Sequence, residues 1–526
     1  MNQNLLTAFF IATLAATSVA QQTLTKSNNL TALSLAGSWV QNVAPTSADT
    51  LLFNSTWGTA GSVPLGGDLS VNGIEISNIS GSGGRITTTS GQTLTLGSGG
   101  INMSSAANSF RIDPAIILSA DQTWSVASGR ILNLVAAGMT GDFTATVGGA
   151  GTLGFDASGT NSYGTQLEVN TAILRVNFAT TDVSFSNPNN SFTSLTVFNG
   201  TARFASIAAA GVDSAAGVFT NAQLGGNGTH GLFVYTGNTA STDRGFTVDR
   251  RSASSGILVS TAGQALTVGG NITHNLGNST GAVNNAFRVG GEGNLVLNGI
   301  ISNNVSGTNN TSLAKEGSGT LTLGGANVFA GGVSAAAGSV LVNNVAGSGT
   351  GTGAVTVASG AALGGSGTIS GATTISGSLR PGNSIGTLTV GNDVTWNGGD
   401  AWVFELGTAA PTLAGAIAGG STQDKLAITG AGSDFLKGSG TSWTFDFAGT
   451  GSEGFYQLST WTGVETFAPG DFTATNLGGG NTGEFTIQDN ALYLEVVPEP
   501  STYALLGLAV LGLGAHVIRR RHTRRA

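Results

Sequence analysis

The chain has 526 residues and a net charge of −8, and only 9% of its residues are charged, against roughly 25% in an ordinary soluble domain. It contains 84 glycines and no cysteine, which excludes cysteine catalysis, cysteine-ligated zinc and iron–sulfur clusters. The hydrophobic fraction of 40% is high enough for a packed core, and the acidic balance predicts no nucleic-acid partner.

The chain begins with an apolar segment. Residues 5–19 read LLTAFFIATLAATSV, and the small residues Ser18 and Ala20 stand at the −3 and −1 positions of a cleavage site before Gln21. This pattern predicts a secretory signal peptide over residues 1–20, cut between Ala20 and Gln21. The start MNQN lacks the usual Lys or Arg, and a buried core segment is the alternative.

The body that follows is made of short alternating runs. Examples are TLTL at 93–96, TLTL at 320–323, SVLV at 339–342 and TLTV at 387–390. Period-2 alternation bounded by Gly or Asn indicates short strands, and no stretch of the body shows sustained helical periodicity. Many evenly spaced strands favour a sandwich, a barrel or a β-solenoid.

Two segments of the body resemble each other, which favours the solenoid. Residues 149–177 and 317–344 both run Gly-x-Gly-Thr-Leu, then Asn-x-aromatic (Tyr163, Phe329), then a strand that ends near Asn. A unit of this size cannot bury its apolar face alone, so stacked neighbours must bury a continuous core.

The segment Lys315–Asn327, KEGSGTLTLGGAN, resembles the autotransporter-associated β-strand repeat. Leu379–Leu388, LRPGNSIGTL, and Gln423–Gly430, QDKLAITG, resemble elements found downstream in such proteins. The resemblance covers 315–430 well and 40–310 weakly, and it implies a right-handed parallel β-helix. The chain departs from true autotransporters because it has no C-terminal stretch long enough for a translocator barrel.

Aromatic residues crowd into 441–495, which predicts a cap or small β-domain over an open end of the solenoid. Trp39, Pro45 and Trp57 are candidates for an N-terminal cap. The expected all-β organisation is a signal peptide (1–20), a solenoid with degenerate repeats and an N-terminal cap (21–310), a repeat region (311–430), an aromatic-rich β cap (431–496) and a C-terminal tail with one transmembrane helix (497–526).

The tail has three parts. Pro498-Glu499-Pro500 precedes Ser501–Ile518, which contains no Asp, Glu, Lys or Arg and as a helix would span about 27 Å, enough for the hydrocarbon core. A cluster of arginines follows and is expected to stay in the cytoplasm: Arg519, Arg520, Arg521, Arg524 and Arg525. A plain stop-transfer helix is one interpretation.

The tail also resembles the PEP-CTERM sorting signal, in which Val497, Pro498, Glu499 and Pro500 form the sorting motif. That family consists of exported bacterial proteins, held at the membrane by the tail and processed near Pro-Glu-Pro by the membrane protease exosortase. The resemblance therefore implies an inner-membrane-anchored precursor that is later found in the cell envelope or outside the cell. Exosortase and the cytoplasmic membrane are the implied partners.

Residues that could carry chemistry are few. The charge-dense stretch is Asp243–Arg251, DRGFTVDRR, where we expect Phe246 and Val248 inward, Arg244 near the flanks and Asp249 outward. β-Helix lyases and hydrolases use such clusters, but a salt-bridged turn is favoured here. Asp424 and Asp434 are a weaker carboxylate pair. His230 and His274 lack metal-ligand spacing, so we expect solvated loop histidines, no metal and no cofactor.

These patterns favour a non-enzymatic structural or adhesive β-solenoid of the bacterial envelope or extracellular matrix, with extracellular polysaccharide as a candidate partner. The alternative is a carbohydrate-active β-helix enzyme that acts on extracellular polysaccharide. A third interpretation is a membrane protein with a permanent single anchor.

Overall fold

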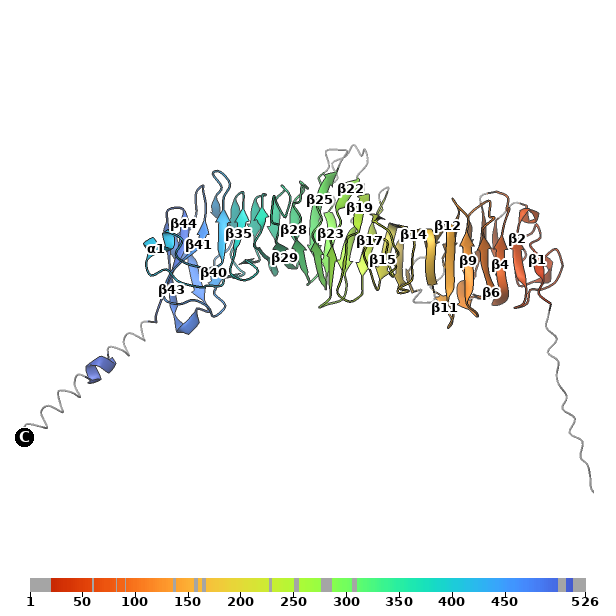
Figure 1. The fold of residues 1–526 in the computed structure, drawn as a ribbon, viewed down its shortest axis with the longest axis horizontal. Coiled ribbons are helices and arrows are strands. Elements are labelled where there is room, and N and C mark those ends of the chain that lie inside the picture. Colours follow the sequence, from red (N-terminus) through yellow and green to blue (C-terminus); the bar gives the residue numbers. More distant parts are fainter. Residues whose placement is uncertain are drawn as a thin grey trace, which may run out of the picture. The chain divides into compact units, whose positions relative to one another are not determined.

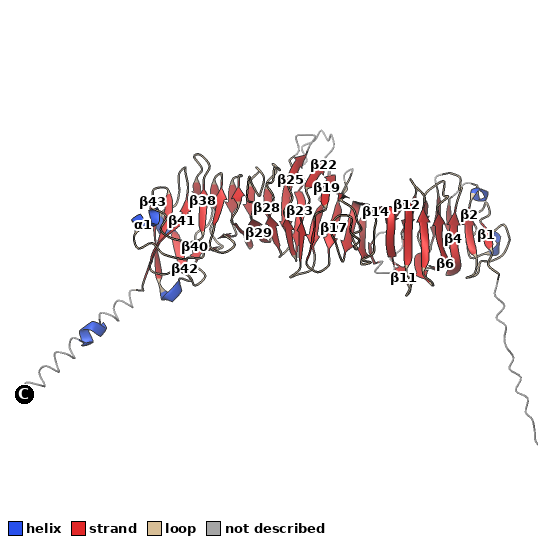
Figure 2. Ribbon diagram, viewed as in Figure 1, coloured by secondary structure: helices blue, strands red, loops and turns tan. Residues whose placement is uncertain are grey.

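The computed structural model of the chain describes residues 20–58, 61–81, 83–89, 91–135, 139–155, 159–162, 167–226, 229–249, 255–275, 286–304, 310–499 and 508–513. It contains two compact units, Met1–Gly151 and Thr152–Ala526. Figures 1 and 2 show that nearly all described elements in both units are strands. The expectation of an all-β fold with parallel sheets is confirmed, and residues 1–19 of the predicted signal peptide lie outside the described residues.

Unit 1 is a stack of parallel strands with two short 3₁₀ helices, η1 (Ala36–Ser38) and η2 (Ser55–Trp57). Its strands are β1 (Thr23–Thr25), β2 (Thr50–Phe53), β3 (Ser62–Pro64), β4 (Leu69–Ile76), β5 (Gly84–Thr87), β6 (Thr93–Met103), β7 (Phe110–Ile112), β8 (Ala115–Leu118), β9 (Gln122–Val126), β10 (Ile131–Leu134), β11 (Met139–Thr140) and the first part of β12 (Ala145–Phe155), whose last four residues belong to unit 2. Leu69 pairs with Leu94, Leu94 with Ile116 and Ile116 with Met139, all in parallel ladders. The chain therefore coils, and each coil lies in register on the one before.

The first strand of unit 1 has its outer edge covered. The Val40 N–H donates to the Thr25 carbonyl at 2.9 Å. The side chain of Gln41 accepts from the Thr25 N–H at 3.0 Å and donates to the Thr23 carbonyl at 3.1 Å. Trp39, one of the expected cap residues, is buried and donates from its ring to the Leu33 carbonyl at 2.9 Å. An amide side chain thus takes the place of a further strand, which keeps this edge from pairing with another chain.

Unit 2 contains the same kind of strand and a short helix, α1 (Leu413–Ile417), which the Thr412 hydroxyl caps. Its first strands are β13 (Gly159–Ser162), β14 (Leu167–Phe185), β15 (Ser194–Phe204), β16 (Asn221–Leu224), β17 (Gly231–Tyr235), β18 (Ala240–Thr242), β19 (Gly245–Asp249), β20 (Gly256–Val259), β21 (Ala265–Val268), β22 (Ile272–Asn275), β23 (Ala286–Gly291), β24 (Asn294–Leu297), β25 (Ile301–Asn304), β26 (Ser312–Glu316), β27 (Thr320–Leu323), β28 (Val333–Ala335) and β29 (Gly338–Val342).

The remaining elements of unit 2 complete the stack. They are β30 (Val355–Val357), β31 (Ala361–Gly365), β32 (Thr368–Ile369), β33 (Thr373–Ile375), β34 (Ser378–Pro381), β35 (Thr387–Val390), β36 (Val394–Trp396), β37 (Trp402–Val403), β38 (Lys425–Ile428), β39 (Phe435–Lys437), β40 (Trp443–Asp446), β41 (Gly454–Thr460), η3 (Pro469–Asp471), β42 (Phe472–Thr475), η4 (Gly478–Gly480), β43 (Thr482–Gln488) and β44 (Ala491–Val497).

The core of unit 2 is built from columns of like residues. One sheet runs β18-β21-β24-β27-β29-β31-β34, and every pair in it is parallel. Its inward positions form one buried aliphatic column: Leu266, Leu295, Leu321, Val340, Leu363 and Leu379. On other strands Phe185, Phe204 and Phe233 form a similar stack of aromatic rings. Alternation along each strand, repeated coil after coil, therefore produces one continuous core.

The end of unit 2 differs from the rest because its last two ladders are antiparallel. Strand β44 pairs with β41 on one side and with β43 on the other. Asp489 and Asn490 connect β43 to β44 with φ of 52° and 56°, the left-handed conformation of a two-residue hairpin turn. Nearby, Trp396 and Trp402 stack with their ring centroids 3.7 Å apart. The hairpin lies within residues 431–496, for which the sequence predicts a cap, whereas Trp396 and Trp402 precede that range.

Residues 508–513, within the predicted membrane helix Ser501–Ile518, are helical. The rest of that predicted helix lies outside the described residues. Among the residues that the structure does describe, no helix is both long and apolar enough to cross a membrane.

Candidate functional site at the end of the last strand

The last strand of unit 2, β44, ends at Val497. In the ladder between β43 and β44, Thr482 pairs with Val497 and Gly483 with Val496. Val496 is buried, and Val497 is half-buried. The sheet therefore holds the chain up to the first residue of the predicted sorting motif.

Pro498 and Glu499 follow directly. A proline has no N–H to donate, so residue 498 cannot continue the ladder. Pro498 is half-buried, whereas Glu499 is exposed. Pro500 and the arginines at 519–521, 524 and 525 lie outside the described residues. The sorting motif thus begins at the last residue of β44, which leaves the peptide bonds beside Glu499 outside the sheet.

A similar arrangement is found at the predicted N-terminal cleavage site. Ala20 and Gln21 are exposed. The first backbone contact with the fold comes from the Gln22 N–H, which donates to Asp49 at 3.1 Å. The predicted cut between Ala20 and Gln21 therefore lies outside the folded unit, at the point where cleavage would leave β1 intact.

The two motif segments at 379–388 and 423–430 meet at Asp424. Its carboxylate accepts from the backbone N–H of Gly386 at 2.9 Å and from that of Glu405 at 2.8 Å. The Lys425 N–H donates to the Gly386 carbonyl at 2.9 Å. Burial raises the pKa of Asp424 from 3.8 to about 6, and the two amide hydrogen bonds oppose this rise. Asp434 accepts from a different amide, that of Val464, so the two carboxylates have separate backbone partners.

Asp424 predicts a specific dependence of stability on pH. Its raised pKa means that the folded state holds the proton more tightly than the unfolded state does. Stability from this group is present below about pH 4 and is lost as the pH rises through about 6. Urea denaturation at about pH 4 and about pH 7 should show wild-type stability falling, relative to Asp424→Asn, by on the order of 1–3 kcal/mol. An equal difference at both pH values would contradict this assignment.

Lys315, the first residue of the repeat-like segment, is buried. Its ammonium donates to the carbonyls of Glu316 at 3.1 Å, Gly317 at 2.7 Å and Ala337 at 3.0 Å. Burial lowers the pKa of Lys315 to about 8, and the charge of Glu316 opposes this shift. The lysine therefore supplies donors to a glycine-rich turn and to the following coil.

The structure corrects the prediction for Arg244. Phe246 and Val248 point inward as expected, but Arg244, expected near the flanks, is fully buried. Its guanidinium lies 4.6 Å from the centre of the Phe219 ring. It donates to a set of carbonyls in one loop: Ala209 at 3.1 Å, Val212 at 3.0 Å, Ala216 at 3.3 Å and Gly217 at 2.7 Å. Burial lowers the pKa of Arg244 to about 10, with the charge of Asp243 opposing.

Asp243, the other charged residue of this stretch whose side chain the structure describes, does not share the interior with Arg244. Asp243 is exposed and accepts from the Ala210 N–H at 2.7 Å. The side chain of Asp249 and residues 250–251 lie outside the described part. The side chains of Asp243 and Arg244 therefore fasten the loop at 209–217 from its outer and inner sides.

The prediction of a solvated loop histidine is wrong for His274. This residue lies on β22 and is buried, with Nδ1 3.1 Å from the Ser302 carbonyl oxygen and its ring against Phe287. His230 is half-buried in a loop. Among the described residues, no group of three or more His, Asp or Glu side chains is placed to hold a metal ion.

One cluster of charged side chains was not predicted from the sequence. Arg85 and Arg111 lie in register on neighbouring strands of unit 1 and share the carboxylate of Asp113. A signal was present, because Arg-Ile occurs at 85–86 and again at 111–112. Each pair is flanked by alternating residues, a pattern that would have placed both arginines outward on successive coils.

Residues 496–521 match the PEP-CTERM protein-sorting motif. The match starts at the last buried residue of β44 and continues through the predicted helix into the arginine cluster. It implies an exported protein that exosortase sorts and processes. A search among curated proteins finds none that matches the chain.

Proposed function

We propose that the protein is exported through the signal peptide at 1–20, held in the inner membrane by a helix that includes residues 508–513, and processed by exosortase beside Pro498-Glu499-Pro500. The mature protein then serves as a structural or adhesive β-solenoid of the bacterial envelope or extracellular matrix. The position of the sorting motif is the observation that carries this proposal. It begins where β44 ends, so a membrane protease reaches it without unfolding the sheet.

The coiled body supports a structural role. Its parallel ladders and columns of like residues give a surface that repeats from coil to coil. We propose further that the coils are right-handed and that 311–430 is an autotransporter-associated β-strand repeat region. The buried ammonium of Lys315 and the carboxylate of Asp424, which joins the two downstream segments, give that region's motif residues a physical role.

The enzymatic alternative depended on a surface cluster at 243–251. Its most useful cation, Arg244, donates instead to carbonyls in the interior. This contact removes a charge stabiliser from the surface and favours the structural role.

Processing is tested by replacing Pro498 and Pro500 together with alanine in the native host. Export should persist because residues 1–20 are unchanged, but the chain should keep the full mass of its tail, since exosortase depends on the motif. Intact-mass measurement of the membrane and extracellular fractions separates the two forms. The matched control is Pro411→Ala, an exposed proline outside the tail, which should be processed normally. Normal processing of the double variant would show that the tail is an ordinary anchor.

A further inference from the structure

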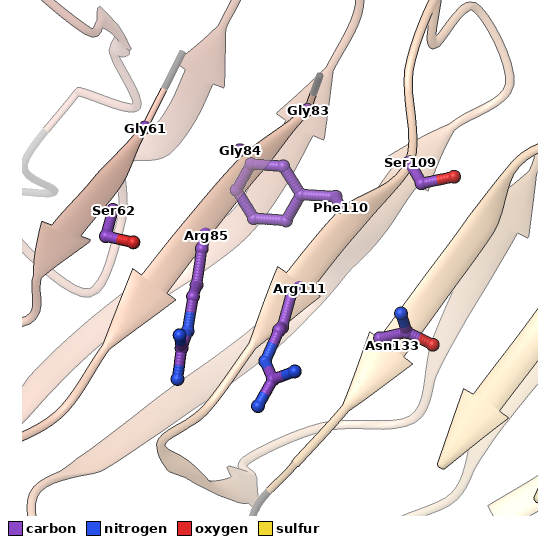
Figure 3. A pocket seen from close by; sticks show the side chains of 9 residues that line it. All are labelled: Gly61, Ser62, Gly83, Gly84, Arg85, Ser109, Phe110, Arg111 and Asn133. Atoms are coloured by element: carbon purple, nitrogen blue, oxygen red, sulfur yellow. The ribbon is translucent and has the colours of Figure 1, made fainter. Parts of the chain in front are cut away.

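A hollow of about 310 Å³ lies on the outer face of unit 1 across β3, β5, β7 and β10. Its polar side chains form a row in register: Ser62 pairs with Arg85, Arg85 with Arg111, and Arg111 with Asn133. Figure 3 shows the two arginine side chains extending side by side from neighbouring strands, with Ser62 and Asn133 beyond them. The row crosses three strand spacings of about 4.8 Å each, about 14 Å in all.

Small residues make the hollow. Gly83 and Ser109 stand two residues before Arg85 and Arg111, directly before β5 and β7 begin, and both line the hollow. Gly83 has a φ of +110°, and a Cβ built there would lie 2.3 Å from the Ser109 carbonyl oxygen. Only glycine fits at this position, so the space above the arginine row stays open.

The row carries an excess of positive charge. The Nε of Arg85 donates to Asp113 at 2.6 Å, and the Nε of Arg111 donates to the same carboxylate at 2.9 Å. Two guanidinium groups therefore share one carboxylate, and none of the residues that line the hollow is acidic. The three charged groups leave one positive charge on the surface of a chain whose net charge is −8.

The other arginine pairs of the described residues are balanced. Arg203 binds Asp182 through two hydrogen bonds, at 2.6 and 2.8 Å. Arg288 binds Glu316 in the same way, at 2.5 and 2.9 Å. In each case one arginine neutralises one carboxylate, which makes the shared carboxylate at Asp113 the exception.

The arginines also keep donors for a further ligand. Among the hydrogen bonds of the described residues, Arg111 uses only its Nε, so its two Nη groups remain available on the exposed side. The side chain of Arg85 is 42% exposed, and that of Arg111 is 34% exposed. A guanidinium with its Nη groups turned outward is suited to a planar carboxylate.

We propose that this row binds an acidic polysaccharide whose sugar units carry carboxylates, with Arg111 as the main cation and Arg85 beside it. Two features favour a sugar chain over a small anion. The row extends beyond the arginines to Ser62 and Asn133, whose side chains both donate and accept hydrogen bonds and so match sugar hydroxyls. The hollow also extends along the whole row, since all four of these side chains line it, and this length accommodates an extended chain.

The biological role of this binding rests on the proposed position of the protein outside the cell, but the binding itself does not. The site lies in unit 1 and the sorting motif in unit 2. A failure of exosortase processing therefore leaves a binding measurement unaffected, and a failure to bind leaves the mass measurement unaffected.

The test is the binding of the full chain, purified in detergent, to immobilised polygalacturonate at about 50 mM and about 200 mM salt. Binding should be present at the lower salt and weaker at the higher. Arg111→Gln should lower the affinity at least about tenfold, since a charge-assisted pair is lost. The affinity of Arg111→Lys should lie between those of wild type and Arg111→Gln, because lysine keeps the positive charge but lacks the two-pronged guanidinium. Asp113→Asn should bind more tightly than wild type, since it removes the competing carboxylate.

Arg203→Gln is the matched control, a surface arginine in a balanced pair, and it should bind like wild type. Far-UV circular dichroism shows whether each variant keeps its β structure. Neutral dextran should not bind, and galacturonate monomer should compete only weakly. The proposal is overturned if the wild-type protein does not bind polygalacturonate, or if Arg111→Gln and Arg203→Gln lower the affinity by the same factor. It is also overturned if galacturonate monomer or polyglutamate binds as well as polygalacturonate does.

Discussion

Replacing Arg244 with alanine should destabilise unit 2 by about 3–5 kcal/mol, because the loop at 209–217 loses its buried donor. The carbonyls of Val212 and Gly217 accept from this guanidinium at 3.0 and 2.7 Å. In the variant these oxygens must either stay unsatisfied or move into water. The contact with the Phe219 ring is lost as well, which adds to the cost.

Two measurements check this result. Urea denaturation of the full chain gives the change in the free energy of unfolding, and amide hydrogen exchange should show faster exchange over residues 206–220. Arg203→Ala is the matched control, because its pair with Asp182 is one-third exposed and should contribute no more than about 1 kcal/mol. Equal effects of the two substitutions would mean that Arg244 is not fastening the loop.

Trp396→Ala should lower the free energy of unfolding by about 3–5 kcal/mol, the usual cost of removing a large core aromatic. Trp396 is fully buried. It stacks on Trp402 and meets the ring of Phe445 edge-on, with centroids 5.2 Å apart. The cavity would open under the C-terminal hairpin, where rings from several strands meet and no single neighbour is able to fill the space.

The measurement is urea denaturation followed by near-ultraviolet circular dichroism, which reports on the packed rings. Val345→Ala is the control, since Val345 is completely exposed, and such a surface change should stay within about 0.5 kcal/mol. A loss below about 1 kcal/mol in Trp396→Ala would indicate that the aromatic cluster adds little to the stability of this end.

Much of the fold could be predicted because the information is local and repeated. In the run at 320–323, Leu321 and Leu323 are buried while the alternating Thr320 and Thr322 are half-buried, as period-2 alternation requires. The hairpin at Asp489 and Asn490 was less visible. Asp-Asn is not among the strongest turn signals, and its positive φ values come from the pairing of β43 with β44.

The contacts of the buried Arg244 side chain could not be predicted from local patterns in the same way. Strict alternation from Phe246 and Val248 places Arg244 inward, but the cost of burying a guanidinium favoured the flanks. The carbonyls that compensate for that cost lie 27–35 residues away in the chain, and no local pattern reveals them. For the same reason the shared carboxylate of Arg85 and Arg111 becomes evident only when successive coils are in register.

The tail begins directly after the last residue of β44, with no spacer between the sheet and Pro498. This connection determines how the protein responds to a force applied through the tail. A load applied through the tail enters β44 at Val497, its last paired residue. Because β44 is hydrogen-bonded to β41 on one side and β43 on the other, a force directed along the strand loads the hydrogen bonds of both ladders at once. With the proposed membrane helix as the anchor, β44 is the strand that joins the body to it, and it then acts as a mechanical clamp against lengthwise shear.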